Sequence, residues 1–251
     1  MKIVPLRILG CVAVGFPLFG ILFAIVWSIL YDFEASNRTI CRVKNFLPTV
    51  SSAIGGFTPQ RYVWRICISL QAGLRFLLAY CYFHWHLRVH MGVKHLLYKN
   101  LVTVAVCCHI LENVALIVLT AISSTDNADI HEKSFITFMV CSQIYMILSC
   151  ILIHWTHRSK VVMPSSQDSL LLKRKVYIWL FNLTIFFTSL YFYFRHNSYC
   201  EPYVYSWFAL CEYLTIFSNI AFHSICCVDF SMYSFTIVHT EDIISGKFKN
   251  S

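Results

Sequence analysis

Charged residues are scarce in this sequence. Asp, Glu, Lys and Arg together make up 13% of the 251 residues, whereas hydrophobic residues make up 58%. A soluble domain is typically about 25% charged and about 45–50% apolar. So few charges cannot cover a water-facing surface, which excludes an ordinary soluble globular protein. The composition indicates that lipid covers much of the molecule.

Motifs for metal and nucleic-acid binding are also missing. The twelve cysteines include no CxxC pair with a matched second pair, and most lie in apolar stretches. We therefore expect no zinc site, no other metal and no cofactor. The net charge of +8 is spread between apolar stretches without an RNA- or DNA-binding motif. This pattern favours contact with a membrane surface and not with nucleic acid.

Six apolar segments are long enough for helices that cross a bilayer, which takes about 20 residues. They cover residues 8–31, 62–84, 101–122, 134–155, 176–194 and 203–228. We predict an all-α, polytopic six-helix bundle over residues 1–230 and a cytosolic tail at 231–251. The first segment exceeds the apolar core of a signal peptide and is expected to be retained.

The distribution of Lys and Arg predicts the orientation of the bundle. With a cytosolic N-terminus, twelve of these residues lie on the cytosolic side and six on the lumenal side. This asymmetry places both termini in the cytosol. A glycosylation sequon at Asn37 then falls in a lumenal loop. Cys41 and Cys200 also become lumenal, where they either form a disulfide or remain free thiols.

Three arginines lie on one side of the second predicted span. Arg61, Arg65 and Arg75 fall within roughly an 80° arc of an ideal helix. Guanidinium groups suit a phosphate, so one interpretation is a slot for a phospholipid headgroup. The other is that Arg65 and Arg75 pair with Glu112 or Glu212 and hold the bundle together.

Polar residues also form stripes inside the third and sixth spans. His109 lies three residues before Glu112, and Glu212, Asn219 and His223 share one helix face. Ionisable groups inside a membrane are costly and are candidates for function. These stripes line a polar cavity or hold helices together by hydrogen bonds.

Reactive residue types occur in the predicted lumenal loops. His131 and Glu132 end one loop, and His196 begins another that contains Glu201. A histidine there could act as a general base for a hydroxyl that attacks an acyl carbonyl. The other interpretation is structural hydrogen bonding.

Residues 47–65 read LPTVSSAIGGFTPQRYVWR, with proline and glycine turns before the second span. We expect an ordered loop over the mouth of the bundle. Its two serines, Ser51 and Ser52, are not predicted nucleophiles, because no G-x-S-x-G surrounds them.

Several strings in the sequence carry a resemblance. They are LPTVSSAIGG (47–56), PQRYVWR (59–65), ENVALIVLT (112–120), IHEKSFI (130–136), RHNSYCE (195–201) and NIAFH (219–223). The chain resembles the post-GPI-attachment-to-proteins factor two family, or its "like" branch, within the wider group of FGF-receptor-activating-protein, DRAM and Sfk-type membrane proteins. The resemblance covers residues 8 to 230.

The resemblance implies a role in remodelling the lipid of GPI anchors. It implies a multi-pass protein of the Golgi membrane, with the endoplasmic reticulum as a second location. The family is required when lyso-GPI-anchored proteins are reacylated at sn-2 with a saturated, stearoyl chain from an acyl-donor lipid. The resemblance leaves open whether the protein is the acyltransferase or supports one. Our leading hypothesis is the acyltransferase, with His131 or His196 as base, Glu132 or Glu201 orienting it, and Arg61 and Arg65 holding the phosphate.

Two other function classes remain open on the sequence. One is a non-enzymatic scaffold that presents lyso-GPI to a separate acyltransferase. The other is a transporter or channel, for which the intramembrane Arg and Glu residues are suitable but no repeated halves are found.

Overall fold

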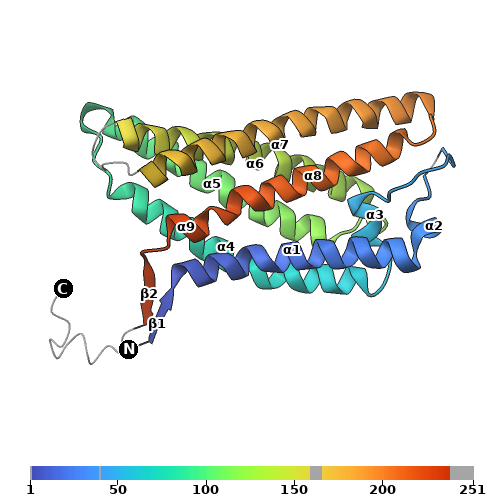
Figure 1. Ribbon diagram of the computed structural model, residues 1–251, viewed down its shortest axis with the longest axis horizontal. Helices are drawn as coiled ribbons and strands as arrows, with labels where there is room; N and C mark the ends of the chain where they lie inside the picture. Colours follow the sequence, from blue (N-terminus) through green and yellow to red (C-terminus); the bar gives the residue numbers. More distant parts are fainter. Residues whose placement is uncertain (1, 40, 159–165, 238–251) are drawn as a thin grey trace.

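A bundle of six long helices dominates the computed structural model, which describes residues 2–39, 41–158 and 166–237 (Figure 1). The long helices are α1 (Leu6–Tyr31), α4 (Gln60–Leu87), α5 (His95–Ala121), α6 (Ala128–Arg158), α7 (Ser166–Tyr199) and α8 (Val204–Ser224). In this part of the chain, six helical segments are long and apolar enough to cross a membrane. The predicted all-α, six-helix fold is confirmed.

Shorter elements join the long helices. They are β1 (Lys2–Pro5), α2 (Phe33–Ser36), α3 (Val50–Gly55), the 3₁₀ helix η1 (Gly92–Lys94), α9 (Cys226–Asp229) and β2 (Ser234–Ile237). The two ends of the bundle carry different short elements. Figure 1 shows α2, α3 and the α7–α8 turn at one end, and both described ends of the chain at the other. Two ends on the same side are what an even number of crossings requires.

The helices extend beyond the predicted apolar segments into polar sequence. The Oδ1 atom of Asn127 accepts a hydrogen bond from the N–H of Ile130 at 3.1 Å and caps the start of α6. His131 therefore lies in the first turns of α6, and His196 lies in the last turn of α7. Our placement of both histidines in loops was wrong, because hydropathy marks where a helix enters lipid and not where its hydrogen bonds begin.

The first described residues pair with the segment that follows α9. Strands β1 and β2 form a two-stranded antiparallel ribbon in which Lys2 faces Ile237 and Pro5 faces Ser234. The sequence analysis predicted no strand, and it placed residues 234–237 in a tail without assigned structure. Residues 238–251 of the predicted tail lie outside the described residues.

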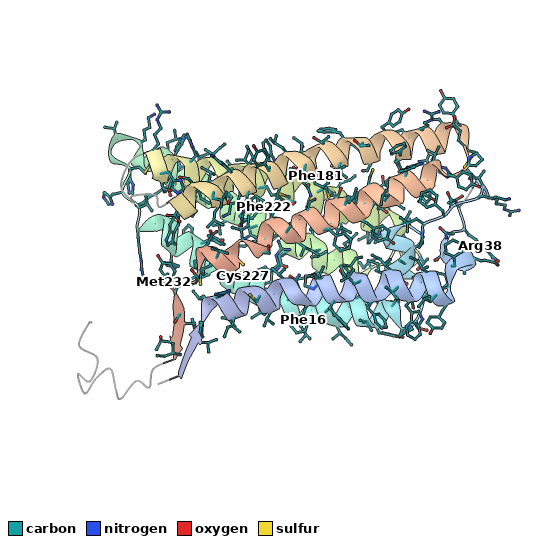
Figure 2. The ribbon with its side chains drawn as sticks, in the orientation of Figure 1. Phe16, Arg38, Phe181, Phe222, Cys227 and Met232 are labelled. Atoms are coloured by element: carbon teal, nitrogen blue, oxygen red, sulfur yellow. A yellow bond between two sulfur atoms is a disulfide. The ribbon has the colours of Figure 1, made fainter. Side chains whose placement is uncertain are left out.

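The outer faces of the bundle are apolar. Large hydrophobic side chains such as Phe19 on α1 and Phe181 on α7 are 59% and 47% exposed, and Figure 2 shows side chains standing out along these helices. In water this surface would be unfavourable, and in a bilayer it faces the acyl chains. Arg38 lies at the α2 end, far from Cys227 and Met232 at the opposite end (Figure 2).

A disulfide joins the two connections at the α3 end. Cys41, which follows α2, is bonded to Cys200 in the α7–α8 turn, and their Cα atoms are 5.4 Å apart. The bond closes a loop over a sequence separation of 159 residues, so it links the first part of the bundle to the last. A long closed loop removes much conformational freedom from the unfolded chain.

We expect the double change Cys41→Ser and Cys200→Ser to lower thermal stability, because a loop of this size corresponds to about 5 kcal/mol in the chain-entropy model. Thermal denaturation of the detergent-solubilised protein measures the effect. The change Cys11→Ser, at an exposed cysteine without a disulfide, is the control. Equal melting temperatures for the double variant and the control would contradict the prediction.

Candidate functional site

The short helix α3 is fixed from three sides. Thr49 caps it by accepting a hydrogen bond from the N–H of Ser52 at 3.2 Å. On the α1 side, the hydroxyl of Ser28 donates to the carbonyl of Ala53 at 3.2 Å. On the α8 side, Glu212 Oε2 accepts from the N–H of Val50 at 3.2 Å. These bonds place the first turn of α3 at a defined position over the bundle.

The turn between α5 and α6 is organised by Asp126. Its Oδ2 accepts hydrogen bonds from the backbone and the hydroxyl of Ser123, at 3.2 and 2.8 Å. Arg61 Nη2 and Arg65 Nη2 reach the same oxygen at 2.8 and 3.4 Å. The hydrogen bonds from Ser123, and then the charge of Arg61, lower the pKa of the Asp126 carboxyl. The carboxylate therefore stays charged at neutral pH and holds both arginines.

Arg65 also secures the end of α5. Its Nε and Nη2 donate to the carbonyl oxygens of Thr120 and Ala121 at 3.2 and 2.7 Å. These are among the last carbonyls of the helix, which have no partner inside it. The main chain at Ile122, directly after α5, is thereby held in place.

His131 of α6 forms a hydrogen-bonded pair with Ser51 of α3. The Nδ1 atom of His131 lies 2.8 Å from the carbonyl oxygen of Ile122, and Nε2 lies 3.1 Å from Ser51 Oγ. A carbonyl oxygen only accepts, so Nδ1 carries the proton of the neutral ring. Nε2 is then the acceptor, and the Ser51 hydroxyl donates to it. This is the arrangement in which a histidine can take a proton from a hydroxyl.

Ser51 and His131 line an internal cavity of about 100 Å³ between the helices. The α4 side of its wall runs from Trp64 through Gln71 and Arg75 to Tyr82. At a rise of about 1.5 Å per residue, this stripe is about 27 Å long. The cavity is thus long and narrow, and Ser51 and His131 lie near its α3 end.

The section of the cavity below Ser51 is mainly apolar. Its wall includes Ile68 of α4, Leu116 of α5, Phe135 of α6 and Ile216 of α8. We call this section, between the Ser51–His131 pair and Arg75, the upper chamber. Its shape and lining suit a hydrocarbon chain better than a compact polar molecule.

A charged cluster marks the lower boundary of the upper chamber. Arg75 Nη2 lies 3.0 Å from Glu112 Oε1 and 2.8 Å from His223 Nε2. Asn219 Nδ2 donates to Glu112 Oε1 at 3.0 Å and to Ser142 Oγ at 2.7 Å. The cluster therefore ties together α4, α5, α6 and α8 at one depth.

Three members of this cluster have the residue types of a metal site. The candidate ligand atoms of His109, Glu112 and His223 lie within 4.8 Å of one another. The Arg75 guanidinium lies within 3.0 Å of both the Glu112 and His223 atoms. A metal ion would have to displace this cation, so the residues fit an ion pair better than a metal.

Comparisons with known proteins support one family. The model of the Frag1/DRAM/Sfk1/Cwh43P N-terminal domain matches residues 5–233. A relative from Xenopus tropicalis, "Acyltransferase PGAP2", is 40% identical over 86% of this chain and 84% of its own length. The Drosophila melanogaster protein "Post-GPI attachment to proteins factor 2" is 37% identical over 93% of this chain and 88% of its own.

The chain belongs to the Frag1/DRAM/Sfk1 family. The Drosophila melanogaster protein named "Post-GPI attachment to proteins factor 2-like" is also similar, at 32% identity over 88% of this chain and 68% of its own length. No solved structure matches this member of the family.

Other predicted site residues of this Frag1-family chain lie elsewhere. Glu132 is exposed, and the Ile122 carbonyl, not Glu132, accepts from Nδ1 of His131. Glu201 binds the Arg195 guanidinium at 2.7 and 3.1 Å, and this contact lowers the pKa of its carboxyl. Its carboxylate is thus engaged with Arg195 and not with the neighbouring histidine.

His196 and Asn37 are both enclosed. The His196 side chain is 2% exposed and stacks on Tyr205 at a centroid distance of 4.5 Å, away from the cavity wall. Both polar atoms of the Asn37 side chain are inaccessible to solvent. Glycan attachment at Asn37 would therefore have to precede folding of this segment.

The predicted polar residues meet different partners. Arg75 pairs with Glu112, which is the second of our two interpretations, whereas Arg65 pairs with Asp126 and not with an intramembrane glutamate. Asp126 was not among the predicted site residues. Ser51 was not a predicted nucleophile either, because its partner histidine is 80 residues away and no local motif marks the pair.

We expect Glu112→Ala to destabilise the protein by about 3–5 kcal/mol, because it leaves the buried Arg75 charge without a partner. Thermal unfolding in detergent measures the loss. The double variant Arg75→Met, Glu112→Met removes both charges and should recover much of the stability. A double variant as unstable as Glu112→Ala would show that the pairing of charges is not what matters.

Proposed function

We propose that this protein acts in GPI-anchor maturation, as an acyltransferase that returns a saturated chain to the sn-2 hydroxyl of lyso-GPI-anchored proteins. The names of its relatives support the pathway. The observation that carries the chemical step is the upper chamber, which is lined by apolar side chains and ends at a histidine bonded to a serine hydroxyl.

The geometry supports acyl transfer at the α3 end. An acyl chain lying in the upper chamber would put its carbonyl beside His131 Nε2. The ring is held by the hydrogen bond from its other nitrogen, Nδ1, to the Ile122 carbonyl. Nε2 then takes the proton of the hydroxyl that is being acylated. The new ester forms as that hydroxyl oxygen bonds the acyl carbon, the donor ester bond breaks, and His131 passes the proton to the leaving glyceryl oxygen.

We assign the α3 end to the lumenal side, where the lipid of a GPI anchor lies. The excess of Lys and Arg at the other end supports this orientation, and so does the disulfide between Cys41 and Cys200. A Golgi or endoplasmic reticulum membrane fits such a lumenal site. Tag mapping that places Cys41 or His131 in the cytosol would contradict the assignment.

We infer that Arg61 binds the lipid phosphate. Its side chain is 26% exposed at the α3 end, and its Nη2 atom lies 2.8 Å from Asp126 Oδ2. It shares Asp126 with Arg65 beside the turn that positions His131. A phosphate here would hold the glycerol of the acceptor near the mouth of the chamber.

The scaffold alternative is tested by reconstitution. Purified protein in liposomes receives lyso-GPI protein and a diacyl donor lipid, and mass spectrometry follows the diacyl product. An enzyme gives turnover without another protein. Binding of lyso-GPI with no turnover would favour the scaffold.

We expect His131→Ala to reduce sn-2 reacylation at least 100-fold, because a general base contributes about 10²–10⁴-fold to rate. Mass spectrometry of GPI lipids in deficient cells that express the variant measures this loss. The control is Lys133→Gln, two residues along α6, which breaks only an exposed pair with Asp129. Full rescue by His131→Ala would contradict the assignment, and His196→Ala tests the second predicted histidine in the same cells.

We expect Arg61→Gln to raise the KM for lyso-GPI about tenfold with a smaller change in kcat, because a charge-assisted hydrogen bond to phosphate contributes roughly 1.5–3 kcal/mol. Steady-state assays in liposomes separate the two constants. Arg195→Gln, at the same end but on α7 and paired with Glu201, is the matched control. An unchanged KM would remove Arg61 from the phosphate site.

A further inference from the structure

We propose that Ser51 carries the acyl group covalently, so that the transfer proceeds in two steps through an acyl-Ser51 ester. This inference rests on the proposed acyltransferase function and adds a nucleophile to it. Ser51 Oγ lies 3.1 Å from His131 Nε2, the nitrogen that acts as the hydrogen-bond acceptor. The first hydroxyl from which His131 can take a proton is therefore the hydroxyl of Ser51.

The size of the cavity favours two steps over one. Direct transfer needs a donor lipid and an acceptor lipid in the site together. The cavity is narrow, with a volume of about 100 Å³. The chains of two lipids lying side by side would need more room than this, so in the proposed order the donor leaves before the acceptor arrives. A covalent carrier keeps the chain in place during the exchange.

The surroundings of Ser51 are built to hold it still. The three anchors of α3, from Ser28, Thr49 and Glu212, fix its backbone. Across the pair, the Ile122 carbonyl fixes the ring of His131. Fixed partners on both sides keep the nucleophile and base aligned without motion of either helix.

The cavity wall also offers a free polar group. The hydroxyl of Thr120 is buried, lines the same cavity as Ser51, and has no hydrogen-bond partner among the described residues. Unpaired buried polar atoms are unfavourable unless something binds them. A carbonyl oxygen that develops negative charge during acyl transfer is a suitable partner.

The chemistry balances without a cofactor. In the first step Ser51 Oγ bonds the acyl carbon of a diacyl glycerophospholipid. The donor ester bond breaks, and the Ser51 proton passes through His131 Nε2 to the leaving glyceryl oxygen. In the second step the sn-2 hydroxyl of lyso-GPI attacks the acyl-Ser51 ester. Its proton passes through His131 back to Ser51 Oγ.

The test uses the full-length protein in liposomes of phosphatidylcholine with an alkyne-tagged stearoyl chain. Without acceptor, the tag should appear on the peptide containing Ser51. Ser51→Ala should lose the label and at least 100-fold of the transfer rate. Ser51→Cys should form a thioester that neutral hydroxylamine removes, unlike the serine ester. The matched controls are Ser52→Ala and Ser52→Cys, because Ser52 belongs to the same turn but bonds Thr49 and not His131.

The outcomes distinguish a failure of the covalent carrier from a failure of the proposed acyltransferase function. Transfer by Ser51→Ala within twofold of the unchanged protein overturns the carrier, while the acyltransferase assignment stands. A 100-fold loss without label at position 51, in either the serine or the cysteine form, also overturns the covalent step and makes Ser51 a positioning residue. Absence of transfer by the unchanged protein overturns both. The covalent carrier is supported if the unchanged protein is labelled at Ser51, Ser51→Ala loses transfer, and the Ser52 variants remain active.

Discussion

The buried pair of Arg75 and Glu112 is the contact on which the interior of the bundle depends. Glu112 is fully buried and Arg75 nearly so, and neither charge could remain in a membrane interior without the other. Asn219 and His223 join the pair from α8, which fixes the relative depth of three helices. Apolar side chains facing lipid cannot fix depth in this way, because sliding along the bilayer normal exchanges one hydrocarbon contact for another.

Because the Arg75–Glu112 pair fixes the helices relative to one another, the bundle can leave unfilled space above this pair. A cavity of about 100 Å³ costs about 2 kcal/mol at roughly 24 cal/mol per Å³. The anchors of α3 are at the far side of that space, where Glu212 binds the backbone of Val50 and the α5–α6 turn is held by Asp126. The charged cluster below and the hydrogen-bonded segment above thus frame the upper chamber, and its walls need not collapse onto each other.

The sequence predicts the parts of this protein that follow from solvation and misses those that follow from local hydrogen bonding. Six apolar segments suffice to predict six helices, since lipid leaves the backbone no other partner. Hydropathy could not place His131 in a helix, because the cap at Asn127 depends on one side-chain contact. It could not pair Ser51 with His131 either, since that contact joins two segments brought together by tertiary structure. The pairing of Arg75 with an intramembrane glutamate could be predicted, because a buried cation requires an anion and the predicted spans contain few acidic residues.

The chamber and the Ser51–His131 pair lie at different distances from the polar end of the bundle, and this separation determines what chemistry the site can perform. In the proposed site, a lipid whose chain fills the chamber would project its ester toward Ser51, whereas an ester without a long chain would gain no binding from the apolar wall. Under the proposed function the wall would select lipids by their chains, and Arg61, partly exposed at the α3 end, would select them by charge. The cavity continues past Arg75 to Tyr82, and a chain that reaches Arg75 would meet the polar groups of the charged cluster there. In the proposed acyltransferase, the charged cluster would favour chains that end above it, so the ion pair that fixes the helices would also influence which acyl chain is preferred.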